Sequence, residues 1–486
     1  MFLSPKTSYF GPIRYATTLL HQFARQYVAN VHRIDRRIHF TAHANIDRYE
    51  GMINNSRCWA GTARRLNGGI TSTAESYKHT CDIEKRDIMK KVLLGTSAIA
   101  LAGAYATSAG AAEWEMKVSG YMEQHLAYAA SDVNGFTGDD FDGVDSKQDA
   151  EIHFKPSITL DNGLKIGAVV ELEAFQNGDQ IDESYLFIKG SFGEILLGSE
   201  NSAGYKMSYG APDVSFVGLN SPSIASFVPF SGALANDNNG DGDTTDAGET
   251  INVGDDLFRG TLSSTFLENG RNNDAQRITY FTPRFAGFQL GLSYARDGNQ
   301  DSNGQLNLNG NTLNNIVDIG ANYVNSFGGF DVAISGRWGI ANNDTAGSNN
   351  PQVWGAGINL GFSGVTIGGS FAEQNNNGDN DGRAFDAGIS YSTGPWAFSF
   401  TYLNGESVDD ETVAGVANGA TGAGNDESLQ SFMLAARYKL AKGVAIGAFG
   451  AYVDFDEDVG DTAGNSAAQG DDVDGFVIGT GIKVNF

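Results

Sequence analysis

The chain has 486 residues and a formal net charge of −26, with 58 acidic and 32 basic side chains. Residues 1–112 hold 15 of the basic and 7 of the acidic side chains, so the remainder carries 51 acidic against 17 basic ones. A surface this acidic excludes nucleic acid as a partner, because binding a phosphate backbone needs clustered Lys and Arg.

Residues 1–88 are rich in Arg and His and show no sustained helical or strand periodicity. They contain both cysteines, Cys58 and Cys81, and five of the seven histidines. Beyond them the sequence therefore has neither a disulfide framework nor a Cys/His metal cluster. We interpret residues 1–88 as a spurious or unstructured upstream extension, translated from a mis-assigned start. A genuine cytoplasmic or regulatory extension is the alternative.

Residues 89–112 have the three-part layout of a secretory signal peptide. A basic pair follows Met89, an apolar run covers residues 92–106, and small residues at 109–111 provide a cleavage site. This predicts a mature chain that begins near Ala112 or Glu113. The alternative for residues 92–106 is a buried core helix, which the basic pair and the small-residue site argue against.

From residue 114 onward, segments of about ten residues alternate between apolar and polar positions. In residues 151–160 (EIHFKPSITL), the even-numbered positions are apolar or Pro and the odd-numbered ones are polar. Transmembrane strands have this period of two, because one face meets lipid and the other meets water. No later stretch approaches the 18 or so apolar residues of a membrane-spanning helix, so a membrane location requires a barrel.

These segments number sixteen, and an even number is typical of a bacterial single-chain barrel. The predicted fold is all-β, a 16-stranded antiparallel transmembrane β-barrel within residues 113–486. We expect strands near residues 114–130, 149–160, 164–175, 180–190, 194–200, 275–283, 286–296, 316–327, 330–340, 352–362, 365–374, 383–393, 395–404, 428–440, 444–455 and 473–486.

The connectors between these strands alternate between long, acidic loops and tight turns. The longest loop covers residues 201–274, whereas dipeptides such as Gly328-Gly329 and Ser363-Gly364 join other strands directly. Glycine in such turns supplies the positive φ angles that two-residue hairpins need. Long loops on one rim and short turns on the other predict an outer-membrane barrel with both termini on the periplasmic side.

Three stretches carry a family resemblance, namely residues 192–198 (FGEILLG), 277–288 (RITYFTPRFAGF) and 479–486 (GTGIKVNF). They resemble Gram-negative outer-membrane porins of the α-proteobacterial general-diffusion type, and the likeness covers nearly all of residues 113–486. It implies a homotrimer in the outer membrane, in contact with lipid and lipopolysaccharide. The terminal Phe486, on an alternating strand, resembles the assembly signal of such barrels.

The same resemblance implies that a long third extracellular loop, here residues 201–274, folds into the pore and narrows it. Acidic residues on this loop would then face a basic cluster on the barrel wall. The expected loop residues are Asp213, Asp255, Asp256 and Glu268, and the expected wall residues are Arg277, Arg337, Arg437 and Lys439.

Residues 237–243 (DNNGDGD) resemble the start of a calcium-binding loop, with oxygen ligands at alternate positions. The twelfth position holds Gly248 instead of an acidic residue, and no flanking helices are expected. A calcium site and a merely solvated acidic loop therefore stay open as alternatives, and no cofactor is expected to be required. The candidate Ca²⁺ ligands are Asp237, Asn239, Asp241, Asp243 and Glu249.

An enzymatic function is not expected, because a hydrolase would need a nucleophile with a His base and an orienting partner. After residue 112 only His125 and His153 remain, and their inward parity fits pore-lining side chains better. The sequence predicts an outer-membrane porin for passive diffusion of small hydrophilic solutes and ions, with weak cation selectivity. A substrate-specific channel and a non-channel structural barrel are the alternatives.

Overall fold

A computed structural model of the protein describes most of the chain beyond residue 112. The described residues are 113–133, 141–174, 181–220, 223–230, 232–235, 250–253, 260–268, 273–300, 313–344, 349–375, 381–408, 426–457 and 472–486. The predicted upstream extension (1–88) and signal peptide (89–112) lie outside these residues and stay predictions.

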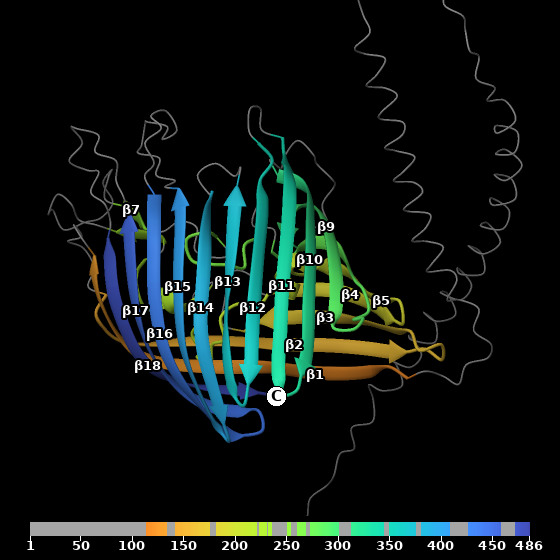
Figure 1. The fold of residues 1–486 in the computed structure, drawn as a ribbon, viewed down its shortest axis with the longest axis horizontal. Helices are drawn as coiled ribbons and strands as arrows, with labels where there is room; N and C mark the ends of the chain where they lie inside the picture. Colours follow the sequence, from red (N-terminus) through yellow and green to blue (C-terminus); the bar gives the residue numbers. More distant parts are fainter. Residues whose placement is uncertain are drawn as a thin grey trace, which may run out of the picture. The chain divides into compact units, whose positions relative to one another are not determined.

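Sixteen strands in the described part of the chain form one closed antiparallel barrel (Figure 1). Neighbours along the chain pair with each other, β5 pairs with β8, and β1 closes the barrel by pairing with β18. The predicted fold class is confirmed. The strands are β1 Glu115–Val133, β2 Gly143–Thr159, β3 Lys165–Glu173, β4 Glu183–Gly190, β5 Gly193–Ser199, β8 Ala275–Phe281, β9 Phe288–Gln300, β10 Leu313–Phe327, β11 Phe330–Asn343, β12 Gln352–Phe362, β13 Val365–Asn375, β14 Gly382–Thr393, β15 Trp396–Val408, β16 Asp426–Ala441, β17 Val444–Glu457 and β18 Val473–Asn485.

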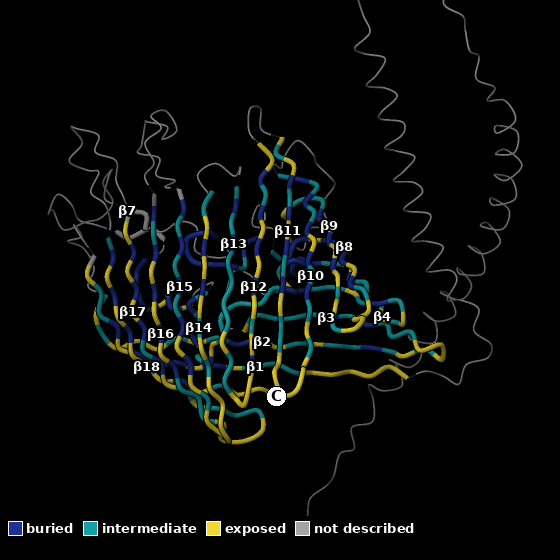
Figure 2. Tube along the Cα trace, viewed as in Figure 1, coloured by how far each residue is buried: buried dark blue, intermediate teal, exposed yellow. Residues whose placement is uncertain are grey.

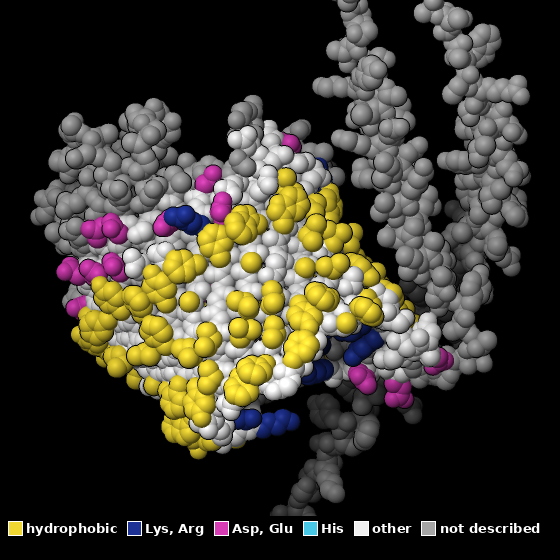
Figure 3. Space-filling model, viewed as in Figure 1, with side chains coloured by type: hydrophobic (Ala, Val, Ile, Leu, Met, Phe, Trp, Pro, Cys, Tyr) yellow, Lys and Arg dark blue, Asp and Glu magenta, His cyan; other side chains and the backbone are white. Residues whose placement is uncertain are grey.

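Burial follows the predicted period of two along the strands (Figure 2). In β8, for example, Arg277 and Thr279 are buried, while the alternate residues Ile278 and Tyr280 are exposed. The exposed positions carry large apolar side chains, which cover much of the barrel face seen in Figure 3. Because strand side chains alternate between the two faces, the opposite, buried positions face the interior of the barrel.

Tight turns join several hairpins at one rim, as the sequence predicts. Gly328 and Gly329 have φ angles of 59° and 90°, and Ser363 and Gly364 have 52° and 84°. Two successive positive φ angles are the geometry of a turn whose twist matches that of the flanking strands. This explains why Gly occupies three of these four positions.

The structure departs from the predicted elements mainly in β2 and in residues 201–274. β2 begins at Gly143 instead of residue 149, because residues 143–148 continue the pairing with β1 despite their turn-like composition. The segment expected to be a loop contains the helix α3 (Ala203–Met207), the 3₁₀ helix η1 (Ser223–Ser226) and a hairpin of β6 (Gly232–Ala235) and β7 (Thr250–Val253). No helix within the described residues is long and apolar enough to cross a membrane.

Candidate functional site

The described parts of residues 201–274, hereafter the inner segment, contact the buried face of the barrel wall. Their polar backbone atoms bind wall side chains in the order of the strands, from β9 to β16. The bonds are Ala203 N to Ser293 Oγ (3.1 Å), Tyr209 N to Ser335 Oγ (2.9 Å), Ala211 N to Asp386 Oδ2 (3.0 Å), Val214 N to Ser399 Oγ (3.1 Å) and Arg437 Nε to Val214 O (2.7 Å). The inner segment therefore follows the inside of the wall.

Apolar packing fixes the later part of the inner segment against β15–β18 and β1. Ile224, Val228 and Phe230 are fully buried in a cluster that includes Phe455 of β17 and Val473 of β18. Buried hydrophobic side chains of this size each stabilise the folded chain by roughly 1.5–3 kcal/mol. This side of the barrel interior is thus a packed core.

The helix α3 begins where the inner segment leaves the wall after β5. Ser202 caps it by accepting a hydrogen bond from Tyr205 N (3.1 Å), and the Ser202 hydroxyl donates to Glu268 (3.0 Å). Lys206 in its last turn lies 2.7 Å from the buried Glu200 carboxylate. A cap bond and an ion pair thus position a helix that is too short to be stable alone.

Arg337 of β11 holds the end of the inner segment to the wall. Its guanidinium lies 3.2 Å from Asp318 of β10 and 3.9 Å from Glu268 of the segment. The side chains of all three are at most 2% exposed. A Cβ at Gly204 would lie 2.9 Å from Arg337 Nε, so glycine lets α3 approach this cluster closely.

The structure thus places Glu268 and Arg337 in contact, with both side chains buried. Arg277 of β8 is also buried, and its Nε donates to Ala275 O (3.3 Å). The assignment of these arginines to the pore constriction stays a prediction. Buried cations of this kind need carboxylate or carbonyl partners, which the wall and inner segment provide.

The other predicted residues are dispersed. The guanidinium of Arg437 in β16 lies 5.3 Å from the centre of the Phe216 ring, and the exposed Lys439 lies two residues beyond it. Asp213 is exposed and accepts hydrogen bonds from Ser399 and Ser215. Two loop acids and the five candidate calcium ligands lie outside the described residues: Asp255, Asp256, Asp237, Asn239, Asp241, Asp243 and Glu249.

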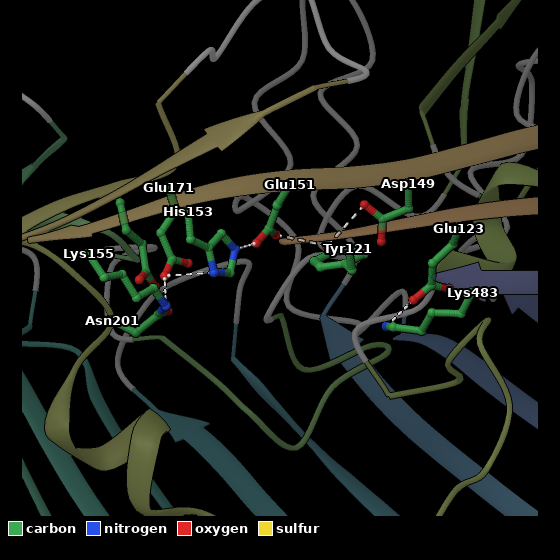
Figure 4. A network of polar contacts seen from close by, with 10 residues as sticks. Tyr121, Glu123, Asp149, Glu151, His153, Lys155, Glu171, Asn201 and Lys483 are labelled. Carbon is green, nitrogen blue, oxygen red and sulfur yellow. Dashed lines mark hydrogen bonds and ion pairs between the residues drawn. The ribbon is translucent and has the colours of Figure 1, made fainter. Parts of the chain in front are cut away.

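The buried face of β1–β3 carries a chain of charged side chains, which we call the acidic wall (Figure 4). Half of its eight members are carboxylates, and these bind neighbouring Tyr, His or Lys side chains; Lys483 comes from β18. The contacts are Tyr121 Oη to Asp149 Oδ1 (3.1 Å) and Glu151 Oε1 (2.9 Å), His153 Nε2 to Glu151 Oε2 (2.6 Å), His153 Nδ1 to Glu171 Oε1 (3.4 Å), Lys155 Nζ to Glu171 Oε1 (2.9 Å), and Lys483 with Glu123.

A sequence profile of the Gram-negative porin family matches residues 96–458. The chain belongs to this family. It is a β-barrel channel protein of the Gram-negative outer membrane. No curated protein sequence matches it.

Several solved structures are similar to this porin. An anion-selective porin from Comamonas acidovorans is 16% identical, with 77% of this chain and 100% of that chain covered and a TM-score of 0.47. A trimer form of OmpT, an outer-membrane protein of Vibrio cholerae, is 14% identical over 77% and 99% of the chains, with a TM-score of 0.45. The outer-membrane channel DcaP of Acinetobacter baumannii is 14% identical over 78% and 99%, with a TM-score of 0.47.

Sequence reasoning missed some residues that organise the interior of this porin. Asp318 and Asp386 are buried acids on β10 and β14, and Asp386 accepts from Ala211 N and from the Asn220 amide (2.6 Å). Strand parity could have marked both as inward. Nothing in the sequence shows which inward acid binds the inner segment, because that depends on where the segment crosses each strand.

Proposed function

We propose that this porin forms a water-filled channel for passive diffusion of small hydrophilic solutes and ions, with weak to moderate cation selectivity. The distribution of charge inside the barrel carries the proposal. Arg277 and Arg337 are buried, whereas Glu151 and Glu171 of the acidic wall keep partial exposure. Charged walls concentrate counter-ions, so an acidic lumen favours cations.

We further propose that the inner segment is the constriction that sets the size limit for solutes. Its hydrogen bonds to β9–β16 and its packing against β15–β18 support this, since they hold it on one side of the interior. The remaining lumen would then lie next to β2–β5, where the acidic wall is partly exposed. A solute would pass between a packed surface and an acidic one.

We also propose that the native assembly is a homotrimer in contact with outer-membrane lipid and lipopolysaccharide. The exposed face of the strands is rich in large apolar side chains such as Leu186, Phe288 and Leu434, which need lipid or protein cover. A trimer that survives mild detergent is the expected outcome, measured by light scattering of the detergent-solubilised protein.

The test of channel function has two parts. Reversal potentials in planar bilayers under a KCl gradient should show a cation preference that falls as salt rises, because the Debye length shortens. Clear anion selectivity would contradict the proposal. Liposome swelling with sugars of graded size should show a smooth cutoff; saturating uptake of one sugar would instead indicate a substrate-specific channel.

A further inference from the structure

Three side chains on adjacent strands of the acidic wall bring metal-ligating atoms together. Glu151 and His153 of β2 and Glu171 of β3 each offer one ligand atom, and these atoms lie within 4.8 Å of one another. Their side chains are 16%, 16% and 12% exposed, so they are reachable from the lumen without being fully solvated. Figure 4 shows the imidazole between the two carboxylates.

We propose that Glu151, His153 and Glu171 form a lumenal binding site for a divalent transition-metal ion such as Zn²⁺ or Ni²⁺. One imidazole nitrogen with two carboxylate oxygens suits these ions, whereas Ca²⁺ and Mg²⁺ prefer oxygen ligands alone. Three protein ligands leave a fourth position for water or a passing solute. The inference does not depend on ion selectivity or on the size limit of the channel.

The backbone fixes two of the ligands relative to each other. His153 and Glu171 are directly paired across β2 and β3, and Glu151 lies two residues earlier on the same face. The hydroxyl of Tyr121 donates to Glu151 Oε1 at 2.9 Å, which leaves Glu151 Oε2 beside the imidazole at 2.6 Å. Such outer contacts orient ligating carboxylates in metal sites. His153 Nε2 faces Glu151 and His153 Nδ1 faces Glu171, so the imidazole and the carboxylates must turn toward a common point to bind one ion.

A further oxygen lies close to the site. Asn201 is 8% exposed, and its Oδ1 is buried without a hydrogen-bond partner in the described structure. Its Nδ2 donates to Glu183, which is the cross-strand neighbour of Glu171, and Figure 4 shows Asn201 beside Glu171 and Lys155. An unpaired buried amide oxygen is costly, and a metal-bound water would give it a donor.

Lys155 is the cation that competes for this site in the absence of metal. Its Nζ lies 2.9 Å from Glu171 Oε1, the same carboxylate that would bind the ion. Removal of this ammonium therefore removes both a competitor and a like charge. Lys155→Gln should bind the metal more tightly than the wild type, which a purely structural role of the cluster does not predict.

Calorimetric titration of detergent-solubilised protein with Zn²⁺ tests the proposal. Apart from any Zn²⁺ held by the upstream cysteines and histidines, the wild type should bind one ion per chain that an excess of Ca²⁺ does not displace. His153→Gln and Glu171→Gln should each weaken this binding at least tenfold, and Lys155→Gln should strengthen it severalfold. The matched control is His125→Gln, which should leave the affinity unchanged. His125 is the other histidine among the described residues, and it lies on β1, on the same face of the sheet as His153 of β2.

Comparison of variants within the same chain cancels any Zn²⁺ bound by the upstream cysteines and histidines. Heat-modifiable gel mobility shows whether each variant is folded. If His153→Gln or Glu171→Gln fails to fold, the affinity of Lys155→Gln still decides the test. Equal affinity of the wild type and His153→Gln, or displacement of Zn²⁺ by Ca²⁺, would overturn the proposal. Conductance of the metal-free protein, recorded separately, reports whether the channel itself is intact.

Discussion

The two sides of the barrel interior differ in how far their charged side chains are buried and in what these side chains bind. On the side of β8–β18, Arg337 and Asp386 are buried and bind the inner segment or its neighbours. On the side of β1–β3, Glu151 and Glu171 remain partly exposed. Glu151 contacts His153, and Glu171 contacts Lys155. Inward parity is the same on both sides, so the exposed fraction of a charged side chain depends on which strands the inner segment covers.

The largest expected effect comes from Arg337→Met, which breaks the contact between the inner segment and the wall. It leaves Glu268 and Asp318 buried without their shared cation, which typically costs roughly 3–5 kcal/mol. We expect a lower urea midpoint of unfolding and a larger single-channel conductance, because the segment is released. The matched control is Arg383→Met, whose ion pair with Glu406 is 61% and 44% exposed and is worth at most about 1 kcal/mol. A variant as stable as the wild type with unchanged conductance would show that Arg337 does not hold the segment.

A second prediction concerns the closure of the barrel, where the two sides meet. Phe486 exchanges two backbone hydrogen bonds of 3.1 Å with Gly120 of β1, and the residue is 62% exposed. Its deletion should lower the yield of folded protein severalfold, measured by heat-modifiable gel mobility after expression. Phe486→Ala keeps the backbone bonds and separates closure from recognition of the ring. Assembly of the truncated protein at the normal rate would contradict both roles.

A third prediction compares a cation on the acidic wall with one covered by the inner segment. Lys155→Gln should raise the cation-to-anion permeability ratio about twofold, since a unit charge about 8 Å from an ion in water contributes roughly 0.5 kcal/mol. Arg437→Gln should change the ratio less, because Val214 and Phe216 engage its guanidinium. Reversal potentials measured at low salt give both ratios. A larger effect at Arg437 would reverse the assignment of the open side.

The smallest effect concerns Lys206 in α3. Burial alone lowers the pKa of Lys206, but the carboxylates of Glu200, Glu183 and Glu171 outweigh it and raise the pKa above its ordinary value. Because the folded pKa exceeds the unfolded one, this contribution to stability is complete below about pH 10 and is lost as pH rises through the folded pKa. Wild-type protein should therefore lose more stability than Lys206→Met between about pH 10 and pH 12, measured by urea unfolding. Parallel losses in both proteins would assign the alkaline unfolding to other groups.

The sequence determined the barrel because a period of two and a tight turn are local properties. Ile278 and Tyr280 had to face outward once Arg277 and Thr279 faced inward, and Gly328-Gly329 could supply its turn without distant contacts. The pairing of sixteen such strands followed from their order in the chain.

Only the tertiary structure decided which inward charges are covered and which stay open. Parity marked Arg337 and Glu171 alike, yet the Arg337 side chain is buried against the inner segment and the Glu171 side chain stays partly exposed. That outcome depends on contacts between residues separated by more than 100 positions, such as Tyr209 with Ser335 and Val214 with Ser399. Such contacts leave no periodic signal in the sequence, because an irregular segment crosses each strand at a position set by packing.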